Sequence, residues 1–456
     1  MFEADKYLDI VKRVHFIGIG GSGMCPLAEI LHSKGYILSG SDNNETDTLK
    51  RIRNLGIDVK MGQCAENING AEMIVYTAAI MADNPELIAA KNSGIPTFER
   101  SKLLGAVSRK FGNCIGISGT HGKTTTTSML TQVLINAGAD PSAVIGGKLP
   151  MTGTNGITGN SDLFVCEACE FSNTFLELSP TCSVILNIDE DHMDYFKTMD
   201  NLKKSFFEFA DMAETVIYNG DDKETLDVIG RLSGKNFISF GKDKSNDWYA
   251  DDIVLNNGAF PEFDIYCKGE RQGRVVLSVP GDHNVYNSLC AVACAVYSGV
   301  DVKTAIELLA DFTGASRRFE KLATINGIDI IDDYAHHPAE LRVTLEAAMK
   351  MNYNKVIAIH QPFTFSRTAM LLDDFADVLK IPDKVLMTEI MGSREKNTYN
   401  IYTKDLADKI PGSEWYPTFE EVADRAIAIA EKGDMIITLG CGDVYKIAKI
   451  IIDKLS

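Results

Sequence analysis

A glycine- and threonine-rich segment from Gly116 to Thr127 constrains the fold of this chain more than any other feature. It follows the apolar run 114–117 and contains the sequence Gly122, Lys123, Thr124. An apolar strand that leads into Gly-Lys-Thr and then a helix is typical of a P-loop, in which backbone N–H groups surround a phosphate. We therefore expect a parallel α/β sheet with a nucleoside triphosphate site at its edge.

The chemistry of that segment supports a phosphate site. Lys123 supplies a positive charge for the β- and γ-phosphate oxygens, and the Thr124 hydroxyl can reach a bound Mg²⁺. The general pattern has glycine where this chain has Ile117, and a plain turn before a threonine-rich helix is the alternative interpretation. The residues of the loop predicted to bind the nucleoside triphosphate are Gly119, Thr120, His121, Gly122, Lys123, Thr124 and Thr125.

Composition excludes several other classes of protein. The formal net charge is −18, from 63 acidic and 45 basic residues, so a broad basic surface for nucleic acid is not expected. The ten cysteines are scattered, which is typical of reduced thiols in a cytoplasmic protein. Cys166 and Cys169 form a C-x-x-C pair without a second pair to complete a zinc site, so we place them in the core. Apolar runs are too short to span a membrane, and we expect no membrane insertion.

A second glycine-rich loop lies near the N-terminus. The expected strand 13–17 is followed by a G-x-G-x-x-G sequence and then by a helix through 27–32. A further strand ends at Asp42, where an acidic side chain can hold a ribose hydroxyl. A tight strand-to-helix turn is the alternative interpretation. The predicted substrate-binding residues here are Gly18, Gly20, Gly21, Ser22, Gly23, Met24, Ser41 and Asp42.

Two later strands, 163–167 and 183–188, are expected to lie in the same sheet as the P-loop. Glu167 ends the first strand and His192 follows the second. Ligands gather at the carboxyl ends of strands in open parallel sheets, so both side chains are placed to meet the P-loop cation. Thr124, Glu167 and His192 are therefore the predicted metal ligands, although a lone histidine is also compatible with a structural role.

The rest of the central region carries a second set of candidates. Residues 248–279 alternate weakly and indicate a small antiparallel insertion. Asn284 and Asn287 lie at the start of an alanine-rich helix expected over 288–298, where their amides can contact a nucleotide base or cap the helix.

A third α/β segment follows residue 314, with strands expected at 329–333, 355–359, 384–387 and 434–439. Domains average about 150 residues, so a chain of 456 residues is long enough for three. We predict an α/β protein with an N-terminal Rossmann-like domain (1–112), a central P-loop ATPase-like domain with a parallel sheet (113–314) and a C-terminal Rossmann-like domain (315–456).

Taken together, the motifs resemble those of the Mur ligase family, in family order from about residue 13 to residue 445. They are the segments from His15 to Met24, Gly119 to Thr124, Asn187 to Asp194, Gly281 to Asn284 and Asp332 to Pro338. The resemblance implies ATP- and Mg²⁺-dependent amide synthesis on UDP-N-acetylmuramate, with L-alanine as the incoming amino acid. The N-terminal glycine loop would then hold the UDP part of the substrate, because a helix N-terminus binds any pyrophosphate. Nicotinamide is not implied. We expect a monomer or a homodimer.

The resemblance also assigns roles to individual residues. It implies catalytic roles for Lys123, Glu167, His192 and Arg367, with Arg367 pairing with the carboxylate of the amino acid. ATP contacts are implied for Asn284, Asn287, Arg318, Asp332 and Asp333, and substrate contacts for His336 and His360.

Two departures from the family pattern affect this assignment. The chain has His360 and Phe363 on either side of Gln-Pro, where the family usually has phenylalanine first and histidine last. It also has Cys169 where the usual Glu-Ala-Asp-Glu segment has aspartate. Three alternatives remain open at this point: a muropeptide-recycling ligase that adds a tripeptide, a UDP-sugar-binding regulatory paralogue, and a dinucleotide-dependent oxidoreductase that leaves the P-loop unexplained.

Overall fold

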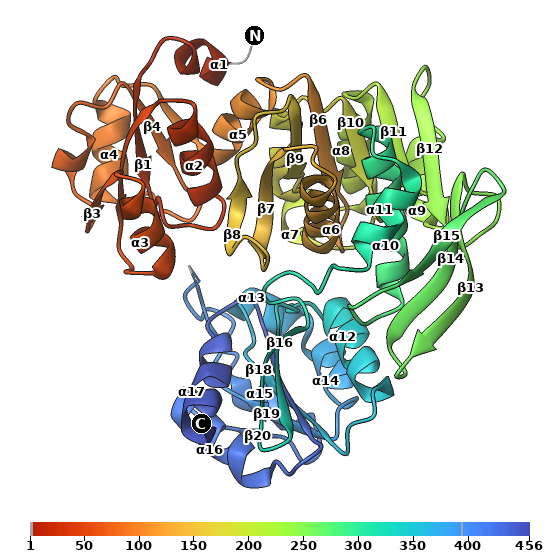
Figure 1. Cartoon of the computed structure of the whole chain (residues 1–456). Helices are drawn as coiled ribbons and strands as arrows, with labels where there is room; N and C mark the ends of the chain where they lie inside the picture. Colours follow the sequence, from red (N-terminus) through yellow and green to blue (C-terminus); the bar gives the residue numbers. More distant parts are fainter. Residues whose placement is uncertain (1–2, 394) are drawn as a thin grey trace. The chain divides into compact units, whose positions relative to one another are not determined.

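The computed structural model describes residues 3–393 and 395–456 and divides into two compact units (Figure 1). The first unit runs to Asp251 and also includes 264–275 and 286–311. The second comprises 252–263, 276–285 and 312–456. Three β-sheets, flanked by helices, confirm the predicted α/β class.

The N-terminal sheet of the first unit is parallel throughout, with the strand order β3-β2-β1-β4-β5. The strand order runs outward from β1 in both directions, through β2 on one side and β4 on the other, as in a doubly wound Rossmann-like sheet. The strands are β1 (Arg13–Ile17), β2 (Ile37–Asp42), β3 (Asp58–Met61), β4 (Met73–Tyr76) and β5 (Thr97–Glu99). The helices are α1 (Glu3–Leu8), α2 (Cys25–Ser33), α3 (Asp47–Asn54), α4 (Pro85–Asn92) and α5 (Arg100–Ser108). The predicted strand 13–17 and helix 27–32 are confirmed.

The second sheet has ten strands in the order β15-β14-β13-β12-β11-β10-β6-β9-β7-β8. Pairing is parallel from β13 to β7, whereas β7 and β8 form an antiparallel hairpin. The central strands are β6 (Asn113–Ser118), β7 (Ser142–Leu149), β8 (Thr154–Ile157), β9 (Leu163–Glu167) and β10 (Cys182–Ile185). They continue through β11 (Thr215–Asn219), β12 (Asn236–Gly241), β13 (Trp248–Asn256), β14 (Phe260–Cys267) and β15 (Glu270–Val276). The predicted insertion at 248–279 corresponds to β13, β14 and β15.

Helices of this region carry or flank the candidate site residues. They are α6 (Lys123–Asn136), η2 (Phe171–Glu177), α7 (Met193–Phe196), α8 (Met199–Asp211), α9 (Lys223–Ile229), α10 (His283–Tyr297) and α11 (Val302–Leu309). The helix expected from residue 288 begins earlier, at His283, so Asn284 and Asn287 lie in its first two turns.

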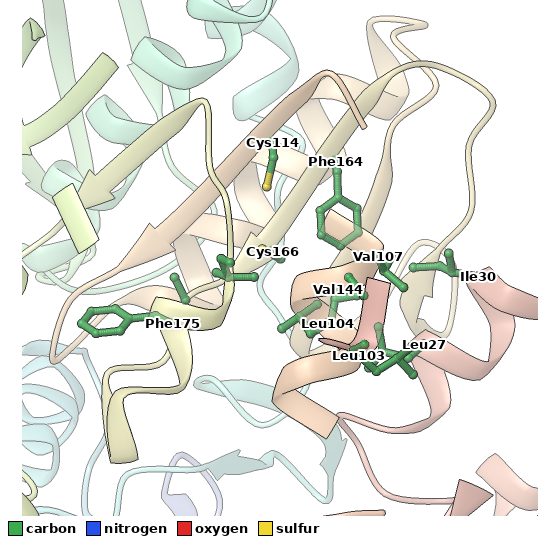
Figure 2. Close-up of a cluster of buried hydrophobic side chains, with 14 of the residues drawn as sticks. Leu27, Ile30, Leu103, Leu104, Val107, Cys114, Val144, Phe164, Cys166 and Phe175 are labelled. Atoms are coloured by element: carbon green, nitrogen blue, oxygen red, sulfur yellow. The ribbon is translucent and has the colours of Figure 1, made fainter. Parts of the chain in front are cut away.

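One hydrophobic core joins the N-terminal sheet to the second sheet. Figure 2 shows Leu27 and Ile30 of α2 close to Leu103, Leu104 and Val107 of α5. Val144 of β7 and Phe164 of β9 belong to the same buried cluster. Burial of apolar surface on this scale holds these two sheets in one compact unit.

The third sheet has the order β16-β17-β21-β18-β19-β20, and only β16 runs antiparallel to its neighbour. Its strands are β16 (Glu320–Ile325), β17 (Ile328–Asp333), β18 (Val356–His360), β19 (Lys384–Met387), β20 (Glu414–Trp415) and β21 (Met435–Leu439). Successive residues alternate between two buried clusters: Ile330 and Ile357 belong to one, Ile331 and Ala358 to the other. Such burial on both faces is expected of a parallel sheet covered by helices on each side.

The helices of this unit are α12 (Pro338–Lys350), α13 (Phe365–Met370), α14 (Leu372–Val378), α15 (Thr403–Ala407), α16 (Phe419–Ile429) and α17 (Tyr445–Leu455). Over residues 3–393 and 395–456, no helix is long and apolar enough to cross a membrane.

Candidate active site

The predicted P-loop joins β6 to α6 and turns through two glycines with positive φ. Gly119 has φ 137° and Gly122 has φ 87°, so both adopt backbone conformations that glycine tolerates best. Gly122 is the residue before the first turn of α6, which begins at Lys123. The N-terminal N–H groups of α6 therefore lie next to the loop, where they favour an anion.

Lys123 is held by the loop and by a carboxylate. Its Nζ donates to the carbonyl oxygens of Gly119 and Thr120, and lies 3.0 Å and 3.2 Å from the two carboxylate oxygens of Glu170. Burial by itself lowers the pKa of Lys123, but the charge of Glu170 and its hydrogen bond to the lysine outweigh burial, and the pKa is raised. The lysine is therefore held in its charged form at the start of α6.

The segment that leads to His192 is tied to the P-loop by hydrogen bonds. The Asn187 carbonyl and side-chain oxygens accept from the backbone N–H groups of Thr120 (3.0 Å) and His121 (2.8 Å). Asp189 N donates to Thr120 Oγ1 at 2.9 Å. Because this segment follows β10, which pairs directly with β6, the parallel register places it beside the P-loop. His192 itself has φ 55°, and its ring lies 4.7 Å from that of Phe171.

Glu167 ends β9, the other neighbour of β6. Its Oε1 accepts from the backbone N–H of Gly146 at 2.5 Å. Thr124 and Glu167 offer hard oxygen donors, and Mg²⁺ usually takes one or two such protein ligands together with waters and phosphate oxygens. Within the described residues, no group of three or more His, Cys, Asp or Glu could hold a metal by itself. The donor set therefore fits Mg²⁺ bound with a nucleotide better than a site made wholly of protein.

The two predicted asparagines differ in their surroundings. Asn287 Oδ1 accepts from Thr126 Oγ1 at 3.2 Å, and a side chain at Gly122 would place Cβ only 2.6 Å from that oxygen. Asn287 thus lies against the P-loop. Asn284 Nδ2 donates to the Pro280 carbonyl oxygen at 2.7 Å. Its predicted contact with ATP stays a prediction.

The N-terminal glycine loop is closed by the end of β2. Gly18 N donates to the Ser41 carbonyl oxygen at 2.8 Å, and Gly20 N donates to Asp42 Oδ2 at 2.9 Å. The Ser41 hydroxyl is fully buried and has no hydrogen-bond partner among the residues that the structure describes. Asp42 therefore stabilises the conformation of the glycine loop, while its predicted contact with a ribose hydroxyl stays a prediction.

In the second unit, the predicted ATP-contacting acids have internal partners. Asp332 is buried and accepts from Arg317 Nε at 2.9 Å and from Thr438 Oγ1 at 2.6 Å. Asp333 accepts from the backbone N–H groups of Phe319 and Ala335. Burial raises the pKa of Asp333 to about 6, against the lowering effects of Arg318 and of those N–H groups. The two acids thus order the segments on either side of them.

Adjacent arginines have different surroundings. The Arg317 guanidinium lies between the rings of Tyr334 and Tyr445, 4.9 Å and 4.8 Å from their centres, and donates to the Gly440 carbonyl oxygen at 2.6 Å. The Arg318 guanidinium lies over Tyr334 at 5.1 Å. Arg317 is thus committed to internal contacts, which leaves Arg318 as the better candidate for a ligand contact.

Two histidines predicted for the amino-acid site lie at the carboxyl ends of β17 and β18, the two parallel neighbours of β21. His336 follows β17; its Nδ1 lies 3.0 Å from the Tyr334 carbonyl oxygen and 3.2 Å from Glu340 Oε2. Burial raises the pKa of the Cys441 thiol to about 12, although the charge of Arg367 opposes this shift. Arg367 lies in α13. His360 at the end of β18 is fully buried, with Nδ1 3.1 Å from the Leu439 carbonyl oxygen. A direct substrate contact by His360 would require that buried side chain to become exposed.

The sequence analysis did not predict two residues that hold the P-loop, Glu170 and Asn187. Glu170 has an exposed fraction of 1% and forms the ion pair with Lys123, and Asn187 holds the P-loop backbone. The signal for Glu170 was a second acid three residues after Glu167, in a segment that follows a strand of the P-loop sheet. Which of the two acids faces the lysine is decided by the turn after β9.

Family models match nearly the whole chain. The models described as Mur ligase family, catalytic domain (residues 13–112), Mur ligase middle domain (117–295) and Mur ligase, glutamate ligase domain (317–442) follow one another along it. The chain belongs to the Mur ligase family.

Individual relatives extend the comparison. A protein named UDP-N-acetylmuramate–L-alanine ligase from Caldanaerobacter subterraneus subsp. tengcongensis is 40% identical over 454 residues, covering 98% of each chain. The protein of the same name from Caldicellulosiruptor bescii is 42% identical over 97% of this chain and 99% of the relative. The crystal structure of UDP-N-acetylmuramate-alanine ligase from Thermotoga maritima matches with a TM-score of 0.83 and 26% identity, covering 97% of this chain and 98% of that one. A murein peptide ligase from Psychrobacter arcticus shares the fold, with a TM-score of 0.76 and 23% identity over 98% and 99% of the two chains.

Proposed function

We propose that this chain is an ATP-dependent ligase that joins L-alanine to the lactyl carboxylate of UDP-N-acetylmuramate, releasing ADP and phosphate, in peptidoglycan precursor synthesis. The observation that carries the proposal is similarity to UDP-N-acetylmuramate–L-alanine ligases along almost the full chain, together with a P-loop whose lysine is charged and ordered. A regulatory protein that only binds UDP-sugar would not need Lys123 beside Glu167 and Glu170.

The first chemical step is phosphoryl transfer from ATP. A carboxylate oxygen of the substrate attacks the γ-phosphorus, the bond from that phosphorus to the β,γ-bridging oxygen breaks, and ADP leaves with the electron pair. Catalysis of such a transfer rests on positioning and on neutralising phosphate charge. Lys123, fixed by Glu170 and the loop carbonyls, supplies that charge, and the N–H groups at the start of α6 supply further donors.

A magnesium ion would complete the charge balance of this step. Thr124 and Glu167 would hold it through oxygen, with His192 as a third ligand. When bound, Mg²⁺ neutralises the β- and γ-phosphate oxygens. Gly146 N, which donates to Glu167 Oε1, orients the carboxylate for that role.

The second step forms the amide. The neutral amine of L-alanine attacks the carbonyl carbon of the acyl phosphate, and the carbon–oxygen bond to the phosphoryl group breaks. Inorganic phosphate leaves with the electron pair, and the amine nitrogen gives up one proton to water or to the leaving phosphate. Arg367 would pair with the alanine carboxylate through two parallel N–H bonds, and His336, held between the Tyr334 carbonyl and Glu340, would contact the amino acid. The N-terminal glycine loop would hold the UDP moiety, while Asn284, Asn287, Arg318, Asp332 and Asp333 remain proposed ATP residues.

The test is a product assay with the purified protein, Mg²⁺-ATP, UDP-N-acetylmuramate and L-alanine. We expect phosphate release and a nucleotide product heavier by one alanyl residue. Lys123→Ala should abolish both, whereas Lys303→Ala, which changes an exposed lysine on α11, should leave them unchanged.

Other outcomes refute the proposal in distinct ways. A product formed with an alanyl-containing tripeptide but not with L-alanine would identify a muropeptide-recycling activity instead. Phosphate release without an alanyl product would show that the predicted amino-acid site does not accept L-alanine. The absence of any turnover would favour a regulatory paralogue that only binds UDP-sugar.

A further inference from the structure

The β7–β8 hairpin, residues 142–157, contacts both the N-terminal glycine loop and Glu167, the candidate metal ligand at the end of β9. It forms the end of the ten-stranded sheet, with β7 paired to β9 and β8 at the edge. An edge strand has unpaired backbone groups that proteins usually protect. Here helix α2, which begins just after the N-terminal glycine loop, packs against β8.

The β7 strand of the hairpin reaches the candidate metal ligand. Gly146 N donates to Glu167 Oε1 at 2.5 Å. A Cβ atom at residue 146 would lie 2.5 Å from Glu167 Oε2 and 2.7 Å from Oε1, which is closer than real Cβ contacts. The absence of a side chain at Gly146 therefore allows the strand to set the position of this carboxylate.

The β8 strand reaches the glycine loop. Asn155 has an exposed fraction of 4%, and its Nδ2 donates to the carbonyl oxygen of Ser22, at the centre of the predicted UDP-binding loop. The next residue, Gly156, approaches the first turn of α2 so closely that a Cβ atom there would lie 2.7 Å from Pro26 Cα. Backbone and side chain thus both fix β8 against the loop.

A charged cluster strengthens this junction. Arg51 of α3 donates from Nη1 to the Gly153 carbonyl oxygen at 3.1 Å, and its Nε lies 2.8 Å from Glu29 Oε1. Thr154 Oγ1 lies 3.3 Å from Glu29 Oε2. These side chains are largely shielded, with exposed fractions of 29% for Arg51 and 12% for Glu29, so their contacts resist screening more than surface pairs do.

We propose that the β7–β8 hairpin sets the position of the nucleotide-sugar loop relative to Glu167, and that Asn155 is the positioning residue for this loop. The inference rests on the proposed function, because it assigns the UDP moiety to the glycine loop. Phosphoryl transfer needs the reacting atoms held about 3–3.5 Å apart, and a displacement of about 1 Å can cost about 100-fold in rate. A hairpin that contacts both the glycine loop and Glu167 provides that constraint.

The experiment compares Asn155→Ala and Asn155→Asp with Thr152→Ala. Asn155→Asp keeps the volume but removes the N–H donor, so it should behave like Asn155→Ala if the hydrogen bond to Ser22 is the active feature. Thr152 is the matched control, because it is exposed and its hydroxyl donates to the Leu149 and Thr154 carbonyl oxygens of the same hairpin. Steady-state kinetics give kcat and KM for each substrate, and calorimetry gives the affinity for UDP-N-acetylmuramate without turnover.

We expect kcat/KM for UDP-N-acetylmuramate to fall about 10- to 100-fold in both Asn155 variants, with direct ATP affinity within about twofold of wild type. Thr152→Ala should match wild type. A purely structural role would lower the melting temperature while leaving these constants unchanged at an assay temperature well below unfolding, and that result would overturn the inference.

Failure of the proposed function gives a different pattern. Wild-type protein that binds UDP-N-acetylmuramate but makes no product would refute the ligase activity, and the hairpin inference would then be decided by affinity alone. Equal calorimetric affinities for wild type and Asn155→Ala would overturn it. Wild-type protein that does not bind the nucleotide sugar would overturn both.

Discussion

Replacing His360 with phenylalanine should change how the stability of the second unit depends on pH. His360 is fully buried at the end of β18. Burial lowers its pKa from 6.5 to about 4; the Leu439 carbonyl opposes this shift and the nearby charge of His336 adds to it. The folded protein therefore favours the neutral imidazole.

The sign and size of the effect follow from linkage. A histidine whose pKa is lowered by folding contributes its full stability above its unfolded pKa and loses it as pH falls through the folded value. A change from 6.5 to about 4, at about 1.36 kcal/mol per unit, gives a loss of roughly 3 kcal/mol between those pH values. That is a large share of the roughly 5–15 kcal/mol that stabilises a typical domain.

His360→Phe removes this titration. The variant also loses the hydrogen bond to Leu439, at a cost of about 1 kcal/mol that does not change with pH. We therefore expect the difference in unfolding free energy between variant and wild type to shift by roughly 3 kcal/mol in favour of the variant as pH falls from 7.5 to 4. Titrations of groups that do not interact with His360 are common to both proteins and cancel.

Urea unfolding followed by tryptophan fluorescence measures this difference. The chain has two tryptophans, and Trp415 of β20 lies in the second unit. In a Trp248→Phe background, Trp415 reports that unit alone. Parallel pH profiles for wild type and His360→Phe between pH 7.5 and 4 would refute the argument that the histidine is held neutral by burial.

Two further changes concern the P-loop. Glu170→Gln removes the carboxylate that fixes Lys123. We expect kcat/KM for ATP to fall about 10- to 100-fold, because truncating a buried charge pair costs several kcal/mol at most. Steady-state constants within twofold of wild type would show that the loop carbonyls alone hold Lys123 in place. Gly122→Ala forces a side chain into a φ of 87° and against Asn287, so it should weaken ATP binding in calorimetry at least tenfold and lower stability by about 1–2 kcal/mol. Gly138→Ala is its control, because Gly138 has a similar φ of 77° with open space around it, and equal ATP affinities in the two variants would contradict the proposed crowding at Asn287.

Short stretches of sequence determined much of this protein by themselves. The P-loop, the N-terminal glycine loop and the strands that precede them could be located because a turn with positive φ needs glycine and a buried parallel strand needs an apolar run. The position of Glu167 beside the P-loop was also predictable, because the carboxyl ends of neighbouring parallel strands meet at one edge of a sheet.

Only the tertiary structure decided which side chains pair across these loops. Lys123 pairs with Glu170 rather than with Glu167, three residues earlier. Asp332 pairs with Arg317 rather than with the adjacent Arg318, and the sequence alone did not distinguish these partners. The contact of Asn155 with Ser22 joins residues that are 133 positions apart. Such pairs depend on strand register and on how closely a hairpin and a helix pack, and both are set by the collective burial of a core that no local sequence pattern specifies.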